Sequence, residues 1–92
     1  DYDYDWLFDP SGLVSFEGQP IGDAELGKFR WYLENHPHLT ALYLNRTRIT
    51  DAGLRHLLRL RNLRFLDLSE TAVTDEGRRW LLERMPDLRI DK

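Results

Sequence analysis

Few residues in this sequence are of the types that perform catalytic chemistry. It contains no cysteine, which excludes disulfides, thiolate metal ligands and thiol nucleophiles. Its histidines are His36, His38 and His56, and without a third neighbouring ligand the first two make a poor zinc or iron site. The paired carboxylates Asp75 and Glu76 suit the positive end of a helix dipole, and we find no phosphate-binding, dinucleotide-binding or hydrolase motif. We therefore expect a protein that is not an enzyme and that holds neither a metal nor a cofactor.

The arginines are better candidates for binding. The net charge of −3 conceals a division, because residues 1–27 carry seven acids and no base, while residues 28–92 carry thirteen bases and nine acids. Adjacent helices could present a basic surface to an acidic protein or a phosphate, although a merely solvated helical face is the simpler alternative. The overall acidity and the intervening acids argue against nucleic acid. The candidate residues of this secondary basic face are Arg55, Arg59, Arg78 and Arg79.

Two copies of one pattern, at residues 39–53 and 63–77, organise the chain. The same residue or a close relative recurs at a constant offset of 24, and such a period indicates stacked repeats. A degenerate first copy occupies residues 14–24. Each copy predicts a short strand followed by a helix. The repeated positions are Leu39, Leu42, Leu44, Thr47, Ile49, Thr50, Asp51 and Gly53, matched by Leu63, Leu66, Leu68, Thr71, Val73, Thr74, Asp75 and Gly77.

The predicted helices begin at recognisable capping residues. Thr50 and Thr74 are suitable N-caps, and the helix of the first copy is expected over about residues 23–35. In the second helix we expect Leu54, Leu57 and Leu58 to face the core. Gly53 and Gly77 recur in the first helical turn, where we expect the missing side chain to let the helix approach the sheet.

This spacing, with its Thr-x-[Ile/Val]-Thr-Asp-x-Gly ending, resembles the leucine-rich repeat proteins, and specifically a form common in bacterial, planctomycete-type proteins that is related to the ribonuclease-inhibitor-like class. The resemblance covers residues 13–92. It implies an α/β fold: a short leucine-rich repeat solenoid of about three repeats and a terminal strand over Leu88–Ile90, with a parallel β-sheet on the concave face and helices on the convex face. It also implies non-catalytic protein binding, usually through the concave side.

The alternation of side chains along a strand then assigns the concave surface. The repeated leucines of each strand point into the core, so their neighbours must point outward. Tyr43 beside Phe65 offers rigid aromatic area of the kind that dominates protein interfaces, and Asp67 offers a charge that can orient a partner. The alternative is that the chain's own N-terminal segment covers Phe65. The predicted partner-binding residues are Ala41, Tyr43, Asn45, Phe65, Asp67 and Ser69.

Residues 1–12 form a separate acidic and aromatic segment, distinct from the repeat domain at 13–92. Aromatic residues alternate with aspartates, as in a half-buried strand, so the segment could fold back as a cap on the first repeat. Alternatively, it is a tail that docks into another protein, or into the basic face of a second copy to give self-association. The Asp-Tyr alternation also resembles tyrosine-sulfation sites of secreted proteins. The candidate docking residues are Tyr2, Tyr4, Trp6 and Phe8.

The sequence predicts no membrane span, because no apolar run approaches the roughly 20 residues that a bilayer requires. It does not fix the compartment, although the cytoplasm is slightly favoured. The chain begins at Asp1 rather than at a methionine, so we expect processing or a longer parent chain upstream. The ending Met85–Lys92 resembles natural ends of such repeat proteins. A structural subunit of a larger assembly is therefore a second hypothesis beside that of a protein-binding module.

Overall fold

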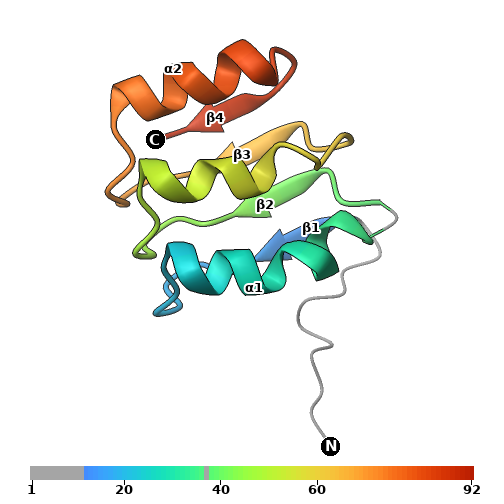
Figure 1. Cartoon of the computed structure of the whole chain (residues 1–92), viewed down its shortest axis with the longest axis horizontal. Helices are drawn as coiled ribbons and strands as arrows, with labels where there is room; N and C mark the ends of the chain where they lie inside the picture. Colours follow the sequence, from blue (N-terminus) through green and yellow to red (C-terminus); the bar gives the residue numbers. More distant parts are fainter. Residues whose placement is uncertain (1–11, 37) are drawn as a thin grey trace, which may run out of the picture.

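A computed structural model of the chain describes residues 12–36 and 38–92 (Figure 1). Short strands alternate with helices along the whole of this part. The last strand ends one residue later than the predicted Leu88–Ile90. The elements are β1 (Leu13–Ser15), α1 (Asp23–Glu34), β2 (Ala41–Tyr43), the 3₁₀ helix η2 (Asp51–Leu57), β3 (Phe65–Asp67), α2 (Asp75–Arg84) and β4 (Arg89–Asp91).

The four described strands form one parallel sheet in the order β1-β2-β3-β4. Leu42 pairs with Val14 on one side and with Leu66 on the other, and Leu66 pairs in turn with Ile90. Figure 1 shows α1, η2 and α2 side by side over one face of this sheet, which leaves the other face without helices. The predicted architecture, a parallel sheet covered by helices on one side, is confirmed.

The core lies between the sheet and the helices, and its side chains come from the repeated positions. The central residue of each of the first three strands is completely buried, as are Leu44 and Leu68 just beyond the strands. Burying a leucine stabilises a fold by roughly 1.5–3 kcal/mol relative to leaving it exposed, so these positions fix which face of each strand turns inward. The alternate residues of the same strands therefore lie on the opposite face of the sheet.

The second helix differs from the prediction in both type and phase. A 3₁₀ helix has three residues per turn, so side chains three positions apart lie on the same face. Leu54, Leu57 and Leu60 share that spacing and are 0, 0 and 4% exposed, whereas Leu58 is 37% exposed. The expectation that Leu58 faces the core was wrong, because it assumed the α-helical period.

Aspartates at the start of each helix connect successive repeats. The carboxylate of Asp23 accepts hydrogen bonds from the backbone N–H of Thr50, at 2.9 Å, and from its hydroxyl. One repeat later, Asp51 accepts the same two bonds from Thr74, with the backbone N–H at 2.8 Å. Asp75 occupies the third such position. We call Asp23, Asp51 and Asp75 the aspartate row.

The aspartate row corrects the reason given for the recurrent glycines. A Cβ atom on Gly53 would overlap the carboxylate of Asp23, and one on Gly77 would overlap that of Asp51. The glycines therefore make room for a carboxylate of the preceding repeat rather than for the sheet. Thr50 and Thr74 also cap their helices as predicted, since their hydroxyls accept from the N–H groups of Ala52 and Gly77.

Candidate binding site on the sheet face

The face of the sheet that carries no helices presents the outward residues of all four strands. We call this surface the sheet face. Parallel pairing aligns its residues in two rows, and their side chains are half-buried apart from that of Arg89, which is exposed. The first row consists of Leu13, Ala41, Phe65 and Arg89, and the second consists of Ser15, Tyr43, Asp67 and Asp91.

An aromatic pair lies at the centre of the sheet face. The rings of Tyr43 and Phe65 come from neighbouring strands, with centroids 5.2 Å apart and planes inclined by 50°. Tilted aromatic pairs at this separation attract each other by about 0.5–1.5 kcal/mol beyond the area that they bury. Neither ring is fully buried, so part of each remains accessible to solvent.

Charged residues surround one side of this pair. The guanidinium of Arg89 lies 6.0 Å from the centroid of the Phe65 ring and also forms an ion pair with Asp91 at 3.6 Å. Asp67 accepts a hydrogen bond from the backbone N–H of Ser69 at 2.9 Å, which orients its carboxylate. Sequence reasoning omitted Arg89 and Asp91 because it built the rows of outward residues from the first three strands only.

Three further predicted residues complete the same surface. Ala41 lies next to Phe65 in the sheet, while Asn45 and Ser69 follow the ends of β2 and β3 with half-buried side chains. The side-chain oxygen of Asn45 is buried and has no hydrogen-bond partner within the described residues. A buried polar atom without a partner is costly, so this oxygen is suited to accept a hydrogen bond from a ligand.

Three of the four arginines of the predicted basic face line hollows of the surface. Arg59 lines a hollow near the end of α1, while Arg78 and Arg79 line another beside Ile90. Arg78 is also engaged by Asp75, at 3.3 Å. The predicted docking residues Tyr2, Tyr4, Trp6 and Phe8 lie outside the described residues.

Among the described helices, the titratable side chains show little that suggests catalysis or metal binding. His56 lies against Gly27 of α1, and burial lowers the pKa of its imidazole, with neighbouring Arg55 and Arg30 acting in the same direction. Its Nδ1 atom is buried without a hydrogen-bond partner in the described part of the chain. Across residues 12–36 and 38–92, no group of three or more acidic or histidine side chains is arranged to hold a metal ion.

Comparison with known protein families assigns the repeats. A family model described as leucine-rich repeat matches residues 35–58 and 59–79, which contain β2, η2, β3 and the beginning of α2. Residues 35–79 therefore carry two leucine-rich repeats. No curated protein and no solved structure was found to match the chain.

Leucine-rich repeat domains are generally protein-interaction modules and typically carry no catalysis of their own. In this chain the repeated leucines serve the fold, because they are buried. Within the described residues, no helix is both long and apolar enough to cross a bilayer.

Proposed function

We propose that this protein is a non-catalytic module that binds another protein through its sheet face. The observation that carries this proposal is the pairing of Tyr43 with Phe65 at 5.2 Å, on the side of the sheet without helices. Aromatic side chains with restricted freedom lose little entropy on binding, and a few such residues commonly supply most of the affinity.

The surroundings of the pair support recognition rather than non-specific adhesion. Leu13 and Ala41 extend the apolar surface toward β1, whereas Asp67, Arg89 and Asp91 place charges of both signs toward β4. A partner that matches this surface needs an apolar centre and polar groups on one side only. The buried oxygen of Asn45 adds a hydrogen-bond acceptor beyond the strand end.

Affinity capture from the source lysate tests the proposal, with a Tyr43→Ala, Phe65→Ala, Asp67→Arg triple variant as the comparison. We expect one protein to be retained by the wild type and its affinity for the variant to fall about 100-fold or more, as loss of central aromatic contacts implies. Circular dichroism must show that the variant is folded. Unchanged affinity for the triple variant would contradict the sheet face as the site.

A structural subunit of a larger assembly is the second candidate, and the position of β4 favours it. β4 is the last strand of the described sheet, with only β3 beside it, and its Ile90 is half-buried. Open strand edges pair readily with further strands. Light scattering over a range of concentrations separates the two candidates, because a monomer at high concentration would count against the structural subunit.

A further inference from the structure

A second surface, distinct from the sheet face, carries arginines without carboxylate partners. Residues 59–64 return the chain from η2 to β3, and we call them the return segment. Arg59, Arg61 and Arg64 are exposed, and in the described part of the chain none of the three forms an ion pair. The arginines that do form ion pairs are Arg30, Arg46, Arg78, Arg84 and Arg89.

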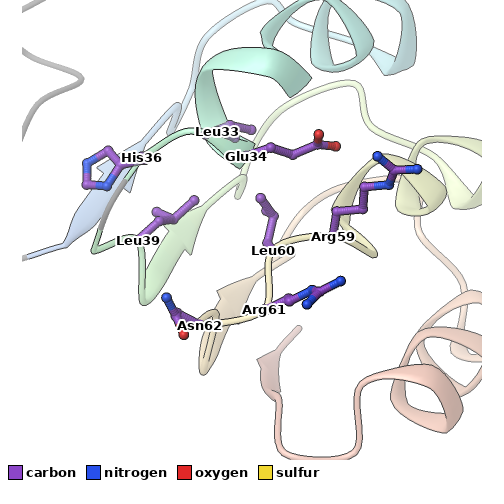
Figure 2. Close-up of a pocket in the computed structure, with 8 residues that line it drawn as sticks. All are labelled: Leu33, Glu34, His36, Leu39, Arg59, Leu60, Arg61 and Asn62. Carbon is purple, nitrogen blue, oxygen red and sulfur yellow. The ribbon is translucent and has the colours of Figure 1, made fainter.

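The first of two hollows beside the return segment has a volume of about 280 Å³. The buried side chains of Leu33, Leu39 and Leu60 line it, and Arg59 and Arg61 belong to its rim. Figure 2 shows these side chains around the hollow together with Glu34, Asn62 and His36. Glu34 is already paired with Arg30 at 3.5 Å, so it leaves the charge of the two rim arginines available.

The second hollow has a volume of about 230 Å³, and Arg61 lines both hollows. Its apolar lining includes Leu58, the leucine that the 3₁₀ helix turns away from the core, together with the buried Leu63 and Leu88. Arg64 also lines it, and the Nη1 atom of Arg64 donates at 3.2 Å to the carbonyls of the return segment. Asp87 is the single carboxylate in this lining.

We propose that the return segment and its two hollows bind an acidic peptide segment of a partner protein. The carboxylates of the peptide pair with Arg59, Arg61 and Arg64, and an apolar side chain of the peptide packs on Leu58 in the second hollow. Guanidinium groups accept carboxylates in a bidentate geometry, and the three unpaired positive charges give the complementarity. Leu58 of the second hollow is 37% exposed and favours an apolar side chain over a sugar-phosphate backbone, so a protein segment fits better than nucleic acid.

Fluorescence anisotropy with a defined probe tests this site. The probe is a labelled synthetic peptide with the sequence of residues 1–9 of this chain, which alternates aspartate with aromatic and aliphatic side chains. Arg59→Ala with Arg61→Ala in the full chain is expected to weaken binding at least tenfold, because charge-assisted contacts are lost. The matched control is Arg55→Ala with Arg79→Ala, which removes the same charge from exposed positions outside both hollows, and it should bind as the wild type does.

Equal losses for the two double variants would show a diffuse charge effect and overturn the site, as would no binding to the wild type up to about 1 mM peptide. A second probe, in which serine replaces every aromatic and aliphatic residue, tests the hollows. We expect it to bind at least tenfold more weakly than the first probe. If it binds equally well, the surface recognises polyanions only and the proposal fails.

The chain's own N-terminal residues have the chemistry of the probe, so their contribution needs a separate control. The full chain with Asp1, Asp3, Asp5 and Asp9 replaced by asparagine is expected to bind the first probe at least as tightly as the wild type does, because a tethered segment of the same sequence can compete with the probe. Loss of probe binding in this variant would show that the probe associates with the N-terminal residues rather than with the return segment. That result would overturn the site.

Discussion

The sheet face and the return segment occupy the same repeats but differ in what holds their side chains. On the sheet face, strand register brings Tyr43 and Phe65 together, and the nearby charges are largely balanced, as in the Arg89–Asp91 pair. On the return segment, Arg59 and Arg61 project from a short loop without a carboxylate partner in the described residues. The difference teaches that strand register places two outward aromatic residues side by side, whereas a loop carries the arginines, and in neither region do these side chains repeat.

Salt should therefore distinguish the two surfaces. Charges exposed to solvent are screened over about 10 Å at 0.1 M ionic strength, while contact between apolar rings is not. Binding at the return segment should weaken steeply as salt rises. Binding at the sheet face should change little.

The largest loss of unfolding free energy should follow a substitution on the inward side of β3, the strand that carries Phe65. Leu66→Ala removes a completely buried side chain, and such changes cost about 2–5 kcal/mol of unfolding free energy because a cavity remains. Phe65→Ala, one residue away on the outward face, should cost only about 1 kcal/mol because the ring is half-buried. Urea denaturation measures both. Equal costs would show that Phe65 serves stability rather than binding.

A smaller loss of unfolding free energy should distinguish Asp51 from Asp75, two members of the aspartate row. Asp51→Ala removes the acceptor of both hydrogen bonds from Thr74 and should cost about 1–3 kcal/mol, because two donors lose a charged partner. Asp75→Ala is the matched control, since Asp75 also begins a helix but forms only an exposed ion pair with Arg78. That change should stay within about 0.5 kcal/mol. Similar losses for the two variants would mean that helix capping, not the link between repeats, explains the row.

The smallest expected effect is a dependence of stability on pH, which should not alter the sheet face or the return segment. Because burial lowers the pKa of His56 below its ordinary value of 6.5, its protonation opposes folding. The free energy of unfolding should therefore have its full value above about pH 6.5 and should fall as the pH drops below that value. Glu25, whose pKa is lowered mainly by the backbone N–H of Gly22, adds a further loss only below about pH 4.5.

Urea midpoints at pH 7.5 and pH 5.0 measure this decline, and His56→Gln should reduce it because glutamine does not titrate. The wild type and the variant would decline in parallel if His56 played no part. Binding of a sheet-face partner at these two pH values should be unaffected, since His56 lies on the helical side of the molecule.

The fold followed from the sequence because apolar periodicity determines burial. The leucines at 42, 44, 66 and 68 were predicted to be inward and are completely buried, and the sheet register follows from their spacing. Leu58 was misplaced because a 3₁₀ helix and an α-helix have nearly the same sequence signal but different periods. Gly53 was misinterpreted because its neighbour, Asp23, belongs to the preceding repeat.

The candidate sites were less predictable. Strand alternation identified the residues of the sheet face, and their role in binding stays a prediction. The return segment was missed as a unit because Arg59, Arg61 and Arg64 follow no helical or strand period, and the two hollows beside it form only when α1, η2 and α2 are in place. Arginines flanking Leu60 and Leu63 were the available signal, since those leucines are buried.

The most direct test compares the two surfaces against one captured partner. Calorimetric titration of that partner should be run with the wild type, with the Tyr43→Ala, Phe65→Ala, Asp67→Arg variant, and with the Arg59→Ala, Arg61→Ala variant. If the sheet face is the principal site, the first variant loses about 100-fold in affinity and the second loses less than about threefold. The reverse order, with the sheet-face variant binding normally and the arginine variant failing, would contradict the proposed function.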